Sequence, residues 1–319
     1  MKKKKVLSFI GLIIVVILWG ITPVISKYLF NHNYYSPALL IGLRGLLSCV
    51  AMLVFILVTK GFKDVNKSYW VCIPAGLILG TAYLLQFIGL ETTTPAKNTF
   101  LESLSCIAVP ICMFIMVKEK PSLANLFAVL GVAIGSFVLC GNGLDFSSMF
   151  TSPTIGDILS SIGGIFFGID IAFTKVFAKN KNATVFVFFQ LIVLTIMSFA
   201  YAIPFEKNLA MSWTFVNILI VIFIGVFCTA ICWVLRTVCI RNVSAVTCAV
   251  IMPMSAVVAA LTSMMFRVEE FSWNVVVGGL IIVAAIVVSG IFDVKKEKEA
   301  ALIEEKKEEV AIDEQNQCL

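Results

Sequence analysis

Charged residues are scarce in this chain. Asp, Glu, Lys and Arg together make up 13% of its 319 residues, whereas hydrophobic residues make up 60%. A soluble domain has roughly 25% charged and 45–50% apolar residues. This composition therefore excludes an ordinary soluble domain and predicts a protein that crosses a lipid bilayer several times. The net charge of +5 does not indicate nucleic-acid binding, because most lysines and arginines lie in short segments between apolar runs.

Residues that form metal sites, disulfides or catalytic centres are also few. The chain has one histidine, His32, and its ten cysteines are scattered without a CxxC pair. This pattern favours small buried cysteines over a metal centre or a disulfide framework. No P-loop sequence is present, which excludes transport driven by ATP hydrolysis of the chain itself. We find no catalytic constellation, and we expect a protein that is not an enzyme and uses no cofactor.

Ten apolar runs are long enough to cross about 30 Å of hydrocarbon. Because the backbone must satisfy its own hydrogen bonds in lipid, we expect these runs to be helices. They cover approximately residues 6–29, 36–59, 69–90, 95–117, 121–140, 154–178, 184–204, 213–240, 243–266 and 272–293. The sequence therefore predicts an all-α membrane protein with about ten transmembrane helices, followed by a charged tail at 294–319.

Lysines and arginines are distributed unevenly between the two sides of this arrangement. If the N-terminus is cytosolic, the inner segments hold most of them, and the outer segments hold little beyond Lys207 and Arg267. The positive-inside rule then predicts that both termini are cytosolic and that the loop around His32 is external. We expect a multi-pass protein of a bacterial inner membrane, surrounded by lipid.

Two stretches of the first half return in the second half. Residues 19–27 match residues 167–175 at an offset of 148 (167 − 19), with identical Gly, Ile and Lys. The pattern of breaks and charges in residues 83–122 returns at 233–272, at an offset of 150 (233 − 83). Two echoes in the same order at nearly the same offset predict an internal duplication.

The duplication divides the ten runs into two repeats, at residues 6–140 and 154–293. Each repeat holds about five spans. Because five is odd, the second repeat must enter the membrane from the opposite side. Such inverted-topology repeats, related by a pseudo-twofold axis in the membrane plane, are typical of transporters.

Short motifs stand at characteristic places in these runs. They are Trp19-Gly20 with Pro23, Arg44, Gln86 to Thr93, Ala96 to Pro110 and Glu119 in the first half, and Gly156-Asp157, Pro253 and Glu269 in the second. In these motifs the chain resembles the drug/metabolite transporter superfamily, specifically its EamA-type members. The resemblance implies ten helices, cytosolic termini and carrier-type transport, often export of amino acids or other small metabolites. Lys97 departs from the pattern, since related sequences usually carry a small or apolar residue there.

Ionisable residues well inside the apolar runs are few. They are Arg44, Glu102 and Asp170. A charge near a helix centre costs roughly 2.5–3.5 kcal/mol on insertion scales, so these side chains should face the bundle interior. Arg44 and Glu102 form either a structural ion pair or part of a substrate site. Asp170 falls at the repeat position of Thr22, and we expect it to face a central cavity; the alternative is a hydrogen-bonded packing residue.

Four basic residues lie near the ends of spans, where snorkelling toward the membrane surface explains them. They are Lys27, Lys97, Lys175 and Arg236. We therefore leave them out of the predicted substrate site. That site combines polar groups and aromatic walls from both repeats, namely Trp19, Thr22, Arg44, Tyr83, Gln86, Asn98, Glu102, Asp170, Gln190 and Trp233.

The predicted function is secondary transport of a small polar or amphipathic metabolite by alternating access. Export is favoured over uptake by the resemblance alone, and proton coupling would use Asp170 as the titratable group. Nucleotide-sugar or drug transport within the same superfamily is an alternative. A membrane-embedded enzyme or a receptor is a further alternative, although an enzyme would need convergent titratable groups that the sequence lacks, and a receptor would not normally show an inverted repeat.

Overall fold

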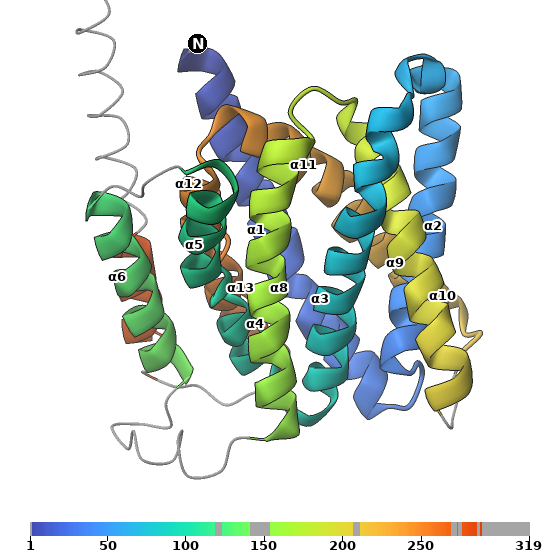
Figure 1. The fold of residues 1–319 in the computed structure, drawn as a ribbon. Helices are drawn as coiled ribbons and strands as arrows, with labels where there is room; N and C mark the ends of the chain where they lie inside the picture. Colours follow the sequence, from blue (N-terminus) through green and yellow to red (C-terminus); the bar gives the residue numbers. More distant parts are fainter. Residues whose placement is uncertain are drawn as a thin grey trace, which may run out of the picture.

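Helices make up nearly all of the computed structural model in the part that it describes, which comprises residues 2–118, 123–140, 154–206, 211–268, 273, 276–285 and 288 (Figure 1). Eight helical stretches there are long and apolar enough to span a membrane. Helix α6 (Leu123–Cys140) and the apolar stretch Val276–Ala285 occupy the other two expected runs. The chain is thus an all-helical membrane protein of about ten spans. Glu119, Glu269 and the tail 294–319 lie outside the described residues.

Several spans consist of more than one helical element. In chain order the remaining elements are α1 (Lys2–Asn31), α2 (Pro37–Val58), two short 3-10 turns (Gly61–Asp64 and Lys67–Val71), α3 (Cys72–Thr92), α4 (Pro95–Glu102), α5 (Ser105–Val117), α8 (Ile155–Phe177), α9 (Ala183–Phe205), α10 (Phe215–Phe223), the π-helix η3 (Ile224–Ile231), α11 (Cys232–Asn242), α12 (Ala245–Ile251) and α13 (Met254–Met265). The fourth span is broken between α4 and α5, and the ninth between α12 and α13. Broken helices that meet near mid-membrane are a recurring feature of transporter binding sites.

The two halves run in opposite directions through the bundle. Helix α1 begins at one face and α8 begins at the other, so that the two helices are antiparallel (Figure 1). We call the face where α1 begins and α8 ends the N-terminal face, and the opposite one the distal face. This arrangement is the inverted repeat that the odd number of spans predicted.

Burial patterns show the same duplication in the second span of each half. Ten of the eleven buried residues of α2 fall on buried residues of α9 when 146 is added to their numbers. Arg44, for example, corresponds to Gln190 (44 + 146). The short polar caps also repeat, since Thr94 and Ser244, 150 residues apart, each accept a hydrogen bond from the backbone N–H three residues on, at the start of α4 and α12.

Lys27 and Lys175 have equivalent roles in the two halves. The Lys27 Nζ donates to the carbonyls of Leu90 and Glu91 at the end of α3, at 2.9 Å each. The Lys175 Nζ donates at 2.8 Å to the carbonyl of Ile240, which is 150 residues after Leu90, near the end of α11. Cations suit helix C-termini because the last carbonyls lack partners there. The snorkelling expectation is therefore wrong for both lysines, which bind helix ends.

Candidate functional site

A cavity of about 310 Å³, including the space at its mouth, lies between the two halves. Its walls come from α1 to α4 of the first half and from α8 and α11 of the second. The lining residues are Trp19, Thr22, Pro23, Arg44, Tyr83, Gln86, Phe87, Glu102, Phe167 and Trp233. Seven of the ten residues predicted for the site are among them. Asn98, Asp170 and Gln190 are the three that are not.

Four aromatic residues form a symmetric group at the cavity. The ring centroids of Trp19 and Trp233 are 4.9 Å apart, and those of Phe167 and Tyr83 are 5.5 Å apart. The repeat symmetry maps one pair onto the other, because Trp19 corresponds to Phe167 and Trp233 to Tyr83. Tyr83 and Trp233 also touch each other, with the Trp233 Nε1 donating to the Tyr83 hydroxyl at 2.7 Å. Equivalent residues that touch must lie beside the pseudo-twofold axis, so the cavity lies at the repeat interface.

Arg44 is the cation of the cavity wall. Its side chain is buried, with the Nε donating to the Thr229 hydroxyl at 2.9 Å and the Nη2 to the Tyr83 hydroxyl at 3.4 Å. The guanidinium carbon lies 5.0 Å from the ring centroid of Tyr83 and 5.1 Å from that of Phe87, within the range of cation–π attraction. The Nη1 is buried and has no hydrogen-bond partner among the described residues. A buried donor left unpaired is costly, so an acceptor bound at the Nη1 would stabilise Arg44.

Glu102 is the carboxylate of the same wall. The Gln86 Nε2 donates to its Oε2 at 2.7 Å. Glu102 is the last residue of α4. The backbone of α8 approaches this end of α4 closely at Gly164, where a Cβ would collide with the carbonyl of Leu101. No ion pair joins Arg44 and Glu102 within the part of the chain that the structure describes. Of the two alternatives from the sequence, the structural ion pair is therefore not formed.

Asp170 does not face the cavity. It is fully buried in an ion pair with the Arg236 Nη1 at 2.9 Å, and it accepts a hydrogen bond from the Gln190 Nε2 at 2.6 Å. Arg236 is only 1% exposed, so the snorkelling explanation is wrong for this residue. Its guanidinium carbon lies 4.6 Å from the Trp233 ring centroid. Sequence spacing placed Arg236 near a span end, but packing against Asp170 encloses it.

The repeat relates this buried triad to the cavity itself. Asp170 corresponds to Thr22 (170 − 148), Gln190 to Arg44 (190 − 146) and Arg236 to Gln86 (236 − 150). All three first-half counterparts line the cavity. In the second half an acid and a base occupy the equivalent positions and bind each other. In the first half these two positions hold the neutral Thr22 and Gln86, and the nearby Arg44 keeps its Nη1 without a partner among the described residues.

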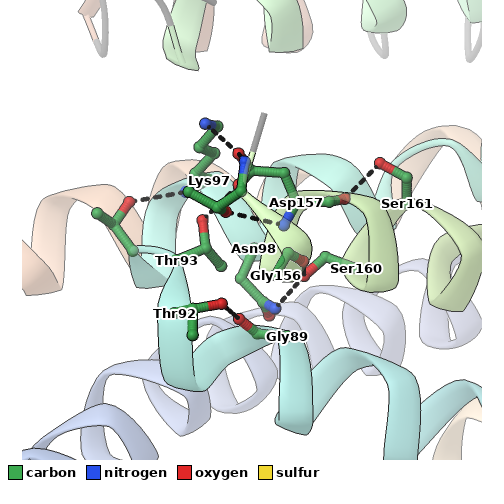
Figure 2. A network of polar contacts seen from close by, with 11 residues as sticks. Gly89, Thr92, Thr93, Lys97, Asn98, Gly156, Asp157, Ser160 and Ser161 are labelled. Atoms are coloured by element: carbon green, nitrogen blue, oxygen red, sulfur yellow. Dashed lines mark hydrogen bonds and ion pairs between the residues drawn. The ribbon is translucent and has the colours of Figure 1, made fainter. Parts of the chain in front are cut away.

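Figure 2 shows the polar network that joins the halves at the distal face. The Lys97 Nζ lies 2.6 Å from the Asp157 Oδ2, and the Thr93 hydroxyl donates to the Asp157 Oδ1 at 2.8 Å. Lys97 is therefore ion-paired, which corrects the snorkelling expectation. Asn98 lies in the same network, with its Nδ2 donating to the Ser160 Oγ at 2.8 Å. These bonds tie the start of α4 to the start of α8, so Asn98 contributes to the junction between repeats rather than to the cavity wall.

The family of the chain follows from its match to a family model. The model described as the EamA-like transporter family matches residues 6–141 and, separately, residues 154–291. The chain belongs to the EamA-like transporter family. This agrees with the resemblance found in the sequence motifs and establishes the protein as a transporter of that family.

Other proteins with similarity to this EamA-like transporter carry transporter names. An "Uncharacterized transporter" of Archaeoglobus fulgidus is 27% identical over 211 residues, which cover 64% of this chain and 62% of that protein, less than two thirds of its length. The "Uncharacterized transporter YoaV" of Bacillus subtilis is 21% identical over 280 residues, covering 87% of this chain and 94% of that protein. A solved crystal structure with 15% sequence identity superposes with a TM-score of 0.69, covering 93% of this chain and 99% of that one, and shows the same fold.

Three residues at or beside the site of this EamA-like transporter are absent from the predicted site. Phe167 lines the cavity, and its position as the repeat counterpart of Trp19 is the sequence signal that could have identified it. Arg236 is the partner that an isolated buried acid at position 170 required. Thr229, which binds the Arg44 Nε, had no signal in the sequence because it lies among apolar residues of the eighth run.

Proposed function

We propose that this EamA-like transporter carries a small amphipathic metabolite with a carboxylate group, and that Arg44 binds this carboxylate. The observation that carries the proposal is the buried Nη1 of Arg44, which lacks a partner in the described structure while its residue lines the cavity. A guanidinium group binds carboxylates strongly because charge and planar geometry are both complementary. The hydroxyls of Thr229 and Tyr83 hold the other two nitrogens.

The remaining cavity wall supports a zwitterionic substrate such as an amino acid. Glu102 supplies a carboxylate on the same wall, with one oxygen bound to the neutral Gln86 amide. A substrate ammonium group placed against Glu102 would compensate its charge. The aromatic group around Tyr83 and Trp233 supplies an apolar surface for a side chain.

Proton coupling is assigned to Glu102 in this proposal rather than to Asp170. Asp170 has its charge compensated by Arg236, whereas Glu102 has a neutral hydrogen-bond partner and lines the cavity. Closing the cavity around an unpaired carboxylate is costly. A proton therefore replaces the substrate ammonium when the empty carrier returns, and one proton moves inward for each substrate exported.

The orientation rests on charge, and the export direction rests on the family resemblance alone. Lysines concentrate at the N-terminal face, among them Lys60, Lys63, Lys118 and Lys181, whereas Lys97 and Arg267 are at the distal face. By the positive-inside rule this asymmetry supports a cytosolic N-terminal face with both termini in the cytosol, and we propose a bacterial inner membrane as the location. Alternating access would move the substrate from this face to the distal face.

Counterflow into liposomes tests the proposal. Liposomes that contain the purified transporter are loaded with one of a panel of neutral amino acids. The amide and the decarboxylated amine of that amino acid are then tested as competitors of its counterflow. Arg44→Gln should raise the KM for the carboxylate substrate by roughly tenfold to a hundredfold, as expected for the loss of a charged hydrogen bond of about 1.5–3 kcal/mol. Arg241→Gln, at the N-terminal face, is the matched control and should behave like the wild type. Equal competition by the amides, or an unchanged KM in Arg44→Gln, would contradict a carboxylate site.

A further inference from the structure

The eighth span contains a π-helix that its counterpart in the first half lacks. Residues Ile224–Ile231 form η3, in which the Thr229 hydroxyl donates to the Ile224 carbonyl five residues back at 2.9 Å. The corresponding stretch of the first half lies within the continuous α-helix Cys72–Thr92. π turns in α-helices are frequent at functional sites and each accommodates extra residues in the helix.

Two glycines show that the second half has one extra residue here. A Cβ on Gly76 would lie 2.8 Å from the Gln190 carbonyl, and a Cβ on Gly225 would lie 3.1 Å from the Arg44 carbonyl. Because Arg44 corresponds to Gln190, these glycines are equivalent, at an offset of 149 (225 − 76). Tyr83 and Trp233, further along the same spans, are equivalent at an offset of 150. One residue has therefore been added between Gly225 and Trp233.

Burial places the added residue among positions 228–230. Cys228 matches the buried Leu79 at the first offset (228 − 79 = 149), and Ala230 matches the buried Gly80 at the second (230 − 80 = 150). Thr229, which is also buried, lies between them in the π-helix. The π-helix thus carries the residue whose hydroxyl accepts the hydrogen bond from the Arg44 Nε.

We infer that Thr229 is a positioning residue of the substrate site. The π-helix directs the Thr229 hydroxyl toward the Arg44 Nε, which orients the guanidinium plane and leaves the Nη1 for the substrate carboxylate. The equivalent contact, between α9 and α3, has no insertion. There Gln190, the counterpart of Arg44, lies against the α-helical Ala75 and donates to its carbonyl at 3.3 Å and to Asp170 at 2.6 Å. This inference rests on the proposed role of Arg44.

Substitutions at Thr229 separate positioning from packing. Thr229→Val keeps the shape of the side chain but removes the hydroxyl, and Thr229→Ser keeps the hydroxyl. In counterflow with the same amino-acid panel, Thr229→Val should raise KM about tenfold, as for one lost hydrogen bond to a charged group. Its maximal rate should stay near the wild-type value, since the Thr229 side chain acts on the substrate through Arg44 and does not touch it. Thr229→Ser should restore the wild-type KM.

Deleting Thr229 gives a second, independent test. The deletion should convert η3 into a continuous α-helix like α3, keep Gly225 and Trp233 in their contacts, and preserve folding. KM should rise as in Thr229→Val. If both Thr229→Val and the deletion variant keep a wild-type KM while Arg44→Gln has a raised KM, the positioning role of Thr229 is overturned and the proposed function stands. If the wild type shows no saturable counterflow with any amino acid, or Arg44→Gln keeps a wild-type KM, the proposed function fails and this inference fails with it.

Discussion

Breaking the Asp170–Arg236 pair should destabilise the fold. Asp170→Asn keeps the size of the side chain but removes its charge, and the Arg236 guanidinium, 1% exposed, then loses the carboxylate with which it is paired. Removing one partner of a buried ion pair costs about 3–5 kcal/mol, because the remaining charge is left uncompensated. This expectation replaces the one drawn from the sequence alone, that Asp170 faces a central cavity and serves as the titratable group of proton coupling.

The first half supplies the compensating variant. Thr22 and Gln86 are the counterparts of Asp170 and Arg236, so the double variant Asp170→Thr/Arg236→Gln gives the second half the neutral residues of the first. It should recover most of the lost stability, since replacing both members of a buried pair is far less costly than removing one. The assay is denaturant or thermal unfolding of purified protein in detergent, with the exposed Glu91→Gln as control, which should change the free energy of unfolding by less than about 0.5 kcal/mol. Asp170→Asn unfolding like the wild type would refute the reasoning.

Three other predictions follow from the structure and the charge distribution. In a variant without other cysteines, a membrane-impermeant thiol reagent applied from outside should label Cys placed at His32 and not at Asp64, and the reverse pattern would invert the proposed orientation. Glu102→Gln should lose accumulation driven by a pH gradient while keeping counterflow with a raised KM, because the substrate ammonium group loses its carboxylate partner, and pH-driven accumulation at the wild-type level would remove Glu102 from proton coupling. Lys27→Met and Lys175→Met should each lower the free energy of unfolding by about 1 kcal/mol through loss of a helix-end cation, and unchanged unfolding in both would show that the two lysines do not stabilise the helix ends.

Much of the fold could be predicted because lipid restricts what a chain can do. Apolar runs had to be helices, and the echo of residues 19–27 at 167–175 fixed the duplication. The cavity residues Trp19, Tyr83 and Trp233 followed from that symmetry. Positions that depend on which sides of two helices face each other could not be predicted in this way.

Asp170 and Arg236 illustrate the difference. They lie 66 residues apart (236 − 170), and nothing in the apolar runs around them tells which face of α8 meets which face of α11. Distance from a span end suggested solvent access for Arg236, whereas neighbouring helices determine its burial. Thr229 was hidden for a similar reason, because the offset changes from 149 to 150 inside a uniformly apolar stretch, where the aligned residues do not reveal the insertion.

The contact between Tyr83 and Trp233 bears on the origin of a duplicated carrier. In a homodimer of two inverted single-repeat chains, the residue beside the symmetry axis would meet an identical copy of itself. Two tryptophans would offer two N–H donors and no acceptor, and neither could bond the other. In one duplicated chain each position can differ from its counterpart, and here Trp233 is the donor and Tyr83 the acceptor at 2.7 Å. A pairing of unlike groups on a near-symmetric axis is available to the fused chain and closed to the symmetric dimer.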